Sequence, residues 1–466
     1  MQAMAAVANG SAPAASSGSL PEQARYGADS VLMKSERVTH KFYPMSGGTY
    51  SPSGSRVIRF DISSPRFLDL SEARFACTFT AGSAIGHAIL DGGLGGTIQR
   101  ISILNSSGQL LERLDEYALT QTMLNQCGDR ARLAKDELWL EENFIGDSLD
   151  LTAPTATGFD NDYYVTNGTE RNISHKLHGG WFQTTKKKLL PPGVGFRLEI
   201  ELVSNADHCL SNTAVVGNAA VNAFTLSNVS INIPTVQIMN QSFEDQTARM
   251  LSRGYRWTGS TYRSYTFSAT AGAGQKITIP DKSLALTGMI GIARLTADIG
   301  SQQSFQNYFR GGNLFGADTG ATQPYNLSIG SQQYPPVQID YATPAGVADD
   351  GLPVLTTANA SYKIDESVAQ CAAVLGHAPL MSHLSWTNPA MDASSANAGD
   401  TAYGLGMACV QVGYGQGVGV DTQTASLPVT FNLGLGANCT LNVYAQCTAT
   451  FSMQPDNGML MVRSFV

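Results

Sequence analysis

The sequence predicts an all-β protein with two successive antiparallel domains and short helices inserted between the strands. First, 47 glycines and 19 prolines are spread along the 466 residues, a distribution typical of many short strands joined by turns. Second, many segments alternate apolar and polar residues with the period of a β-strand. Third, this pattern stops at a helical segment near residue 240 and then starts again. Together these observations predict two β domains.

The first domain is expected over residues 35–239. The polar segment before it, 1–34, has too few large apolar side chains to pack by itself, so we expect it to form an N-terminal arm. The clearest strand is 195–202, whose apolar side chains share one face while charged ones occupy the other. The strands expected in this domain are 57–62, 74–80, 97–104, 172–177, 195–202 and, as one or two strands, 223–239.

The pattern changes after the turn at 105–108. From residue 109 to residue 143, Leu110, Leu114 and Tyr117 fall near helical spacing, and Gly128 separates two helical pieces. We therefore expect a helical insertion between two strands of the first domain.

A second helical pattern, 240–254, is expected to be the junction between the domains. Ser242 is placed to cap it, acidic residues lie in its first turn, and Gly254 ends it. Strand patterns then return, which predicts a second domain over 255–466 that includes a further helix at 365–375. The strands expected there are 262–268, 275–279, 288–299, 427–435, 438–453 and 459–466.

The composition restricts the possible functions. Charged residues make up only 14% of the chain, which is typical of a protein whose faces are covered by neighbours. The net charge of −8 argues against sequence-specific nucleic-acid binding. The sequence has no run of 18 apolar residues, so no transmembrane segment is expected, and its N-terminus lacks the pattern of a signal peptide.

The seven cysteines form no CxxC pair and no zinc spacing, which indicates reduced thiols in a cytosolic or nuclear compartment. Cys439 and Cys447 are separated by an even number of residues in an alternating segment, so both are expected on one side of a strand, as buried thiols rather than as a bridge.

We expect no enzyme, because the sequence contains no P-loop, no HExxH zinc motif and no Gly-x-Ser-x-Gly elbow. No catalytic, cofactor-binding or metal-binding residue is assigned, and no cofactor is expected. The glycine-rich run Gly413–Gly419 does not match a nucleotide-binding fingerprint and is expected to be a flexible loop or a strand edge.

Several clusters of polar residues contain side chains that could form a site, but each has a simpler structural interpretation. His175 and His178 are expected at the surface, on opposite faces of a strand, and a metal site there is disfavoured. A minority candidate for calcium is the loop group Asp147, Asp150, Asp160 and Asp162. Two acidic pairs are of the kind that glycosidases use but are expected on solvated faces: Glu141 with Glu142, and Glu199 with Glu201. An exposed turn, Lys186, Lys187 and Lys188, is a minority candidate for a phosphate or partner contact.

One segment is more specific than composition. Residues 172–204 contain the aromatic pair Trp181-Phe182, then Leu189-Leu190-Pro191-Pro192, then the alternating strand from Phe196 to Leu202. This order resembles a block in the first barrel of double jelly-roll major capsid proteins, most like those of polinton-like viruses, which are related to virophage and nucleocytoplasmic large DNA virus capsid proteins. Residues 288–299 and 326–335 are similar to later parts of the same family. The motif concerns packing and carries over no active-site residue.

The resemblance implies two consecutive antiparallel eight-stranded jelly-roll barrels with short helices in inter-strand insertions. It further implies a structural major capsid protein, made in the host cytoplasm, that trimerises into pseudo-hexameric capsomers and tiles an icosahedral DNA virus shell together with minor capsid and penton proteins. The insertions at 109–143 and 300–426 would then form outer towers and intersubunit contacts.

Two alternatives remain at this point: a minor virion component, and a secreted jelly-roll carbohydrate-binding or glycan-degrading protein. The second would normally show a signal peptide and clustered tryptophans, whereas Trp139, Trp181, Trp257 and Trp386 are dispersed along the chain.

Overall fold

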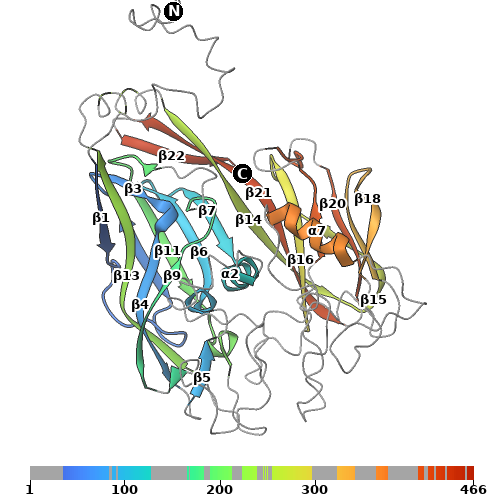
Figure 1. Cartoon of the computed structure of the whole chain (residues 1–466), viewed down its shortest axis with the longest axis horizontal. Helices are drawn as coiled ribbons and strands as arrows, with labels where there is room; N and C mark the ends of the chain where they lie inside the picture. The colour runs from blue at the N-terminus through green and yellow to red at the C-terminus, as the bar shows by residue number, and fades with distance from the viewer. Residues whose placement is uncertain are drawn as a thin grey trace, which may run out of the picture.

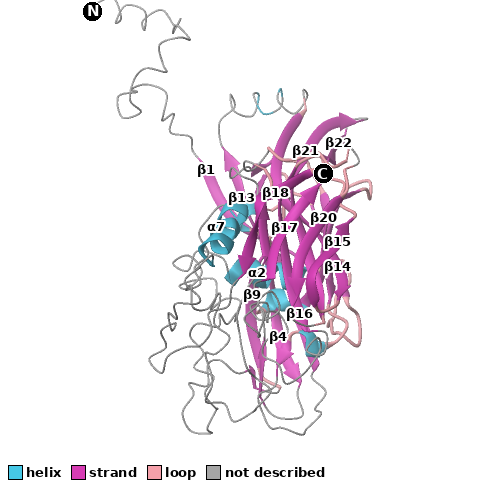
Figure 2. Cartoon of the chain, turned by 90° about the vertical axis from the view of Figure 1, so that its right-hand side faces the viewer, coloured by secondary structure: helices cyan, strands magenta, loops and turns pink. Residues whose placement is uncertain are grey.

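In the computed structural model of the protein, two β-barrels lie side by side (Figure 1). Seen from the side, the strands of both barrels stand roughly upright (Figure 2). The structure describes residues 35–82, 87–90, 93–126, 165–166, 168–182, 189–211, 223–238, 245, 247, 249, 254–295, 323–341, 364–375, 408–413, 418–423, 427–435, 438–456 and 459–465.

Two antiparallel sheets form the first barrel. The main strands of one follow the order β1-β13-β4-β9, and the short strands β3 and β10 extend it beside β13; the other has the order β2-β11-β6-β7. Numbered along the chain, the eight main strands follow the orders 1-8-3-6 and 2-7-4-5. Their bounds are β1 (Ser35–Phe42), β2 (Val57–Ile62), β4 (Arg74–Gly82), β6 (Ile98–Asn105), β7 (Leu110–Asp115), β9 (Glu170–Lys176), β11 (Phe196–Leu202) and β13 (Ala223–Ile238). Shorter strands are β3 (Phe67–Asp69), β5 (His87–Leu90), β8 (Val165–Thr166), β10 (Leu189–Leu190) and β12 (Leu210–Ser211).

The second barrel repeats the same topology, with sheets β14-β21-β16-β19 and β15-β20-β17-β18. Its strands are β14 (Tyr255–Ala269), β15 (Gly272–Ile279), β16 (Leu286–Leu295), β17 (Gln323–Ile329), β18 (Gln332–Tyr341), β19 (Ala408–Gln411), β20 (Val429–Leu435) and β21 (Cys439–Asp456), and β22 (Met459–Phe465) pairs with the end of β21. Two sheets of four strands in this order form a jelly roll. The predicted fold, two consecutive eight-stranded antiparallel jelly rolls, is therefore confirmed.

Strand β11 shows why these residues form the barrel. Its side chains alternate between buried and half-buried along the whole strand, as predicted. Leu198 lies between Phe60 of β2 and Ile103 of β6, and all three are buried. Alternation therefore directs one face of three neighbouring strands into a single core.

Residues 223–239, expected as one or two strands, form a single strand of 16 residues. β13 pairs with β4 along its first half and with β1 along its second. A register shift between Ser227 and Ser230, next to Asn228 with a φ of 49°, marks a bulge that bends the strand between these partners.

The helical insertion expected from residue 109 is wrong over its first part. Residues Leu110–Asp115 form β7, which pairs with β6 across a hairpin. The backbone carbonyl of Asn105 accepts from Gly108 N at 3.0 Å, and its side chain accepts from Gln109 N at 2.8 Å, so the turn leads straight into a strand. Helix α2 (Tyr117–Gln126) then begins. Residues 127–143 lie outside the described part.

The segment 300–426 is not simply an insertion, because it supplies three strands of the second barrel, β17, β18 and β19. The predicted helix at 365–375 is confirmed as α7 (Ile364–Leu375), which contacts β16, β18 and β19 on the flank of the barrel (Figure 2). Gly288 of β16 allows this approach, since a Cβ there would lie 2.9 Å from Val374 Cγ2.

Asp245, Thr247 and Arg249 are helical within the predicted junction, whereas Ser242 lies outside the described residues. Gly254 has a φ of 85°, a conformation that favours glycine. The arm at 1–34 also lies outside the described part, and the domain boundaries stay a prediction. Among the described helices, none combines the length and apolarity needed to cross a membrane.

Candidate functional site at the junction between the barrels

The two barrels exchange side chains across their boundary. Strands β14 and β21 extend from the second barrel along the first (Figure 1). Trp257 of β14 and Phe451 of β21 belong to the hydrophobic core of the first barrel, while Ala118 and Leu119 of α2 belong to the core of the second. Each core is therefore completed by residues from the other half of the chain.

An aromatic cluster fills the junction on the side of the first barrel. The ring of Trp181 lies 5.4 Å from that of Trp257, 5.2 Å from that of Phe451 and 5.4 Å from that of Phe196, measured between centroids. Trp181 and Trp257 have exposures of 0% and 5%. Tryptophans dispersed in the sequence thus meet in space, but they are buried and cannot stack on a sugar ring.

Beside this cluster, the backbones of the two barrels touch through glycines. A Cβ on Gly259 of β14 would lie 2.1 Å from the carbonyl oxygen of Gly180, so no larger residue fits there without displacement. A Cβ on Gly180 would lie 3.1 Å from both Ser260 O and Glu112 Oε1. The close approach therefore depends on a glycine in each barrel.

Glu112 of β7 connects the same two segments. Its carboxylate accepts hydrogen bonds from Gly180 N at 2.7 Å, Trp181 N at 2.8 Å and Thr261 Oγ1 at 2.5 Å. Burial raises the pKa of Glu112, and these three hydrogen bonds oppose the rise. Glu112 forms no ion pair within the described part of the chain. The carboxylate is held by neutral donors from both barrels, so it acts as a clasp between them.

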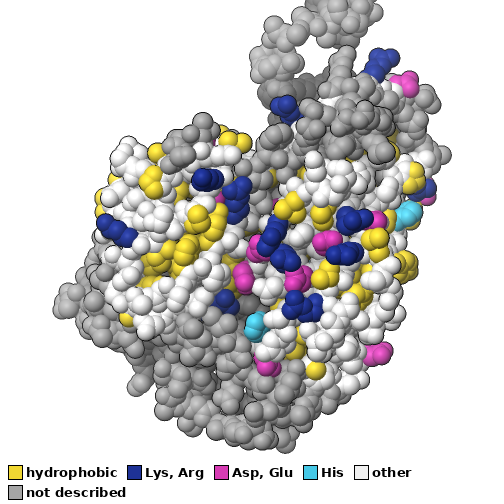
Figure 3. Space-filling view, turned by 180° about the vertical axis from the view of Figure 1, so that it is seen from behind, with side chains coloured by type: hydrophobic (Ala, Val, Ile, Leu, Met, Phe, Trp, Pro, Cys, Tyr) yellow, Lys and Arg dark blue, Asp and Glu magenta, His cyan; other side chains and the backbone are white. Residues whose placement is uncertain are grey.

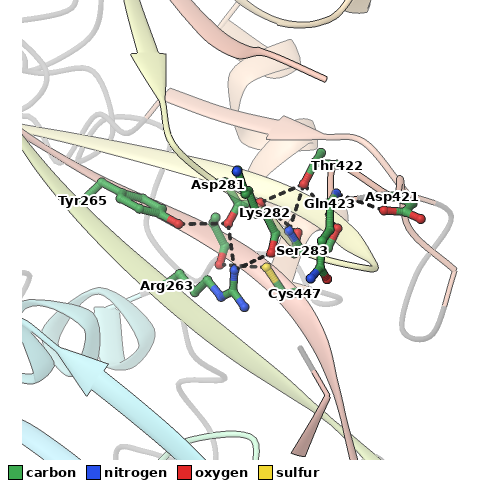
Figure 4. A network of polar contacts seen from close by, with 10 residues as sticks. Arg263, Tyr265, Asp281, Lys282, Ser283, Asp421, Thr422, Gln423 and Cys447 are labelled. Atoms are coloured by element: carbon green, nitrogen blue, oxygen red, sulfur yellow. Dashed lines mark hydrogen bonds and ion pairs between the residues drawn. The ribbon is translucent and has the colours of Figure 1, made fainter. Parts of the chain in front are cut away.

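A second buried carboxylate, Asp281, fixes loops inside the second barrel (Figure 4). It accepts from Tyr265 OH at 3.0 Å and from Ser283 Oγ at 2.7 Å, and Arg263 Nη1 lies 3.6 Å away. Thr422 joins the segment 418–423 to this group, because its Oγ1 accepts a hydrogen bond from Ser283 N at 2.9 Å. Burial, with the charge of Asp281, raises the pKa of Tyr265. The Asp281 side chain is 0% exposed, so the cluster can tie loops together but cannot meet a substrate.

The two histidines correct the sequence interpretation. His175 is fully buried and forms a 2.8 Å hydrogen bond between its Nε2 and Tyr117 OH. Strand β9 ends at Lys176, so His178 is not constrained to the opposite face, and its ring centroid lies 5.9 Å from that of His175. His178 N also donates to Tyr117 OH at 3.0 Å. The prediction of two surface histidines on opposite faces is therefore wrong, and His175 serves in packing.

Glu199 and Glu201 lie half-buried on the outer face of β11, where Glu199 pairs with Arg59 of β2, and Glu201 pairs with Arg100 of β6 and with Arg56 directly before β2. In the glycine-rich run, Gly413 lies against the backbone of residues 418–419, because a Cβ on Gly413 would be 2.3 Å from Val418 O and 3.0 Å from Gly419 Cα. Residues 414–417 are outside the described part, as are Glu141, Glu142, Asp147, Asp150, Asp160, Asp162, Lys186, Lys187 and Lys188.

Six of the seven cysteines are described, and all six are buried and free of disulfide bonds: Cys77, Cys209, Cys371, Cys409, Cys439 and Cys447. Burial raises the pKa of Cys439 to about 11 and that of Cys447 to about 12, so these thiols stay protonated near neutral pH. This confirms buried thiols at 439 and 447. The described residues contain no group of three or more His, Cys, Asp or Glu side chains that could hold a metal ion.

The junction itself was missed from the sequence. Glu112 appeared to belong to an amphipathic helix, where a carboxylate is expected to face solvent. The pair Gly179-Gly180 directly before Trp181 was the one available signal, because adjacent glycines beside a large aromatic residue indicate a close backbone approach. Its contact with Gly259 has no counterpart in local sequence.

Solved structures share this fold along almost the entire chain. A chain in the structure of the Sputnik virophage matches with a TM-score of 0.58 at 10% identity, covering 95% of this chain and 92% of that one. The mavirus major capsid protein matches with a TM-score of 0.54 at 10% identity, over 97% and 94% of the two chains. The Faustovirus major capsid protein matches with a TM-score of 0.51 at 10% identity, over 92% of each.

The sequence matches no family model and no curated protein. At 10% identity these structural likenesses show the fold, which is the double jelly roll of viral major capsid proteins.

Proposed function

We propose that this chain is the structural major capsid protein of an icosahedral DNA virus and that it has no catalytic role. Three copies form a pseudo-hexameric capsomer, and capsomers tile the virion shell together with minor capsid and penton proteins. The observation that carries this proposal is the repetition of one strand order, 1-8-3-6 and 2-7-4-5, in two barrels of the same chain.

Each chain contributes two barrels of one topology, held side by side, so a trimer contains six similar units around its threefold axis. Such a trimer has a nearly hexagonal outline, and hexagonal units tile a surface. The clasp at Glu112 and the contact between Gly180 and Gly259 support this role, because they fix one barrel against the other. Two of the structures that share the fold are named as major capsid proteins, and each match covers more than nine-tenths of both chains.

The composition supports assembly as well. A chain with 14% charged residues covers little of its surface with charge, as expected where neighbours cover it. The carbohydrate-binding alternative loses support, because Trp181 and Trp257 are buried in the junction.

Light scattering on the purified protein tests the proposal. We expect a mass of three times 49.4 kDa or a larger assembly, and electron microscopy should show particles with a threefold or hexagonal outline. A stable monomer at micromolar concentration would contradict the capsid role.

A further inference from the structure

The outer face of sheet β2-β11-β6-β7 concentrates charge in a chain that is poor in it (Figure 3). Every cation of this group is an arginine, and arginine is enriched at protein interfaces whereas lysine is depleted. The group consists of Arg56, Arg59, Asp61, Arg100, Arg113, Asp115, Arg197, Glu199 and Glu201.

The corresponding face of the second barrel is different. There β15, β17 and β20 carry one cation and otherwise neutral polar side chains: Lys276, Thr278, Ser328, Thr430 and Asn432. The outer face of these three strands therefore carries much less charge than β2, β6 and β11 do in the first barrel. Stability does not explain the charge, because exposed ion pairs contribute only about 0.2–1 kcal/mol each.

Four of these residues, which we name the charge square, form a regular pattern on β2 and β11. Arg59 Nε lies 2.8 Å from Glu199 Oε1, and Arg197 Nε lies 2.8 Å from Asp61 Oδ1. The register places Arg59 opposite Glu199 and Asp61 opposite Arg197, so the sign of charge alternates along each strand and between the strands. Side-chain exposures of 57%, 28%, 42% and 54% for Arg59, Glu199, Arg197 and Asp61 leave all four able to contact a second surface.

This pattern is complementary to itself. A twofold axis that runs along the strands, midway between β2 and β11, places Arg59 over Glu199 of a second copy and Arg197 over Asp61 of that copy. A contact in which one patch meets the same patch requires a twofold axis, whereas contacts around a threefold axis join two different patches. The charge square therefore cannot meet its own copy within a trimer.

We propose that the charge square of β2 and β11 is a twofold contact between neighbouring trimers, and that its partner is the charge square of a second copy of this chain. This inference rests on the proposed capsid function. In this contact, buried pairs of opposite charge fix the register between trimers and disfavour other arrangements.

Two variants with opposite charge test the proposal. The acidic variant is Arg59→Glu with Arg197→Glu, and the basic variant is Asp61→Lys with Glu199→Lys. Each one alone places like charges across the twofold axis, which costs several kcal/mol, so association between trimers should weaken by roughly a hundredfold or more. Separately purified acidic and basic trimers, when mixed, should associate again. Lys276→Glu is the control, since it changes charge on the corresponding face of the second barrel and should leave assembly unchanged.

The measurements are light scattering for the trimer, and sedimentation velocity with electron microscopy for joined trimers and shells. Circular dichroism first establishes that each variant is folded. We expect trimers to persist in every variant, and wild-type association to weaken in 1 M salt, where the Debye length is about 3 Å. Both variants joining trimers as well as wild type does, or a mixture that fails to recover, would overturn the inference and leave the capsid function standing. A wild-type chain that stays monomeric would overturn both.

Discussion

The contact between Gly259 and Gly180 gives the sharpest test of the junction. In Gly259→Ala, the new Cβ would lie 2.1 Å from Gly180 O, whereas ordinary contact begins at 3.4 Å, so β14 must move by about 1.3 Å. Such a shift overpacks the site, at about 1–3 kcal/mol. It also breaks the 2.5 Å hydrogen bond from Thr261 to the Glu112 carboxylate, worth about 1.5–3 kcal/mol.

We therefore expect Gly259→Ala to lower the free energy of unfolding by about 2.5–6 kcal/mol. Guanidinium unfolding followed by circular dichroism measures this loss, and limited proteolysis should show faster cleavage between the barrels. Gly47→Ala is the matched control, because its Cβ would have nothing within 4 Å and its φ is not positive. An unfolding midpoint equal to that of wild type in Gly259→Ala would refute the close contact between the barrels.

Three further predictions concern the cores and the clasp. Trp181→Ala should lower the free energy of unfolding in guanidinium by about 3–5 kcal/mol, because it empties the junction cluster. Tyr43→Ala, at a position that is 68% exposed, should change it by less than about 0.5 kcal/mol. Similar losses in both variants would contradict the cluster. Glu112→Gln should remove one source of the pH dependence of folding stability. In the folded protein the pKa of Glu112 lies above its ordinary value of 4.5, so the contribution of this group to stability falls as the pH rises from about 4.5 to the folded pKa. The wild type should therefore lose stability relative to the variant over that range. A difference between the two proteins that is constant with pH would count against a raised pKa. Leu198→Asp should abolish folding, as measured by circular dichroism, because it buries an unpaired charge, whereas Glu199→Gln should cost at most about 1 kcal/mol; equal effects would show that the alternation of β11 is wrongly assigned.

Regular alternation made much of the fold predictable from the sequence. Strands β2, β4, β11 and β20 have buried side chains at every second position over most of their length, and the sequence of α7 fits a helix. Strand β7 was missed because Leu110, Leu111 and Leu114 fit a helix as well as a strand, and because Glu112, at an inward position, breaks the alternation. Strands β17 and β18 were missed because Asn326 is buried and two prolines, Pro335 and Pro336, lie within β18.

The junction could not be predicted, because it depends on contacts between distant residues. Glu112 meets Thr261, 149 positions away, and Trp181 meets Phe451. No local periodicity records such a pairing. The charge square was partly visible, since Glu199 was expected on the outer face of a strand, but the arginine that faces it is set by the register of β2 against β11.

The exchange of side chains between the cores affects the order of events during synthesis. The core of the first barrel includes Ala449, Phe451 and Met453 of β21, which are synthesised after the first seven strands of the second barrel. A nascent chain that has emerged only as far as the junction has all eight strands of that barrel, but its aromatic cluster still lacks Trp257 and Phe451. The first barrel therefore matures only after β21 of the second barrel has been synthesised. Truncated products keep an open apolar surface that quality control can recognise, and they do not present the finished junction to partners.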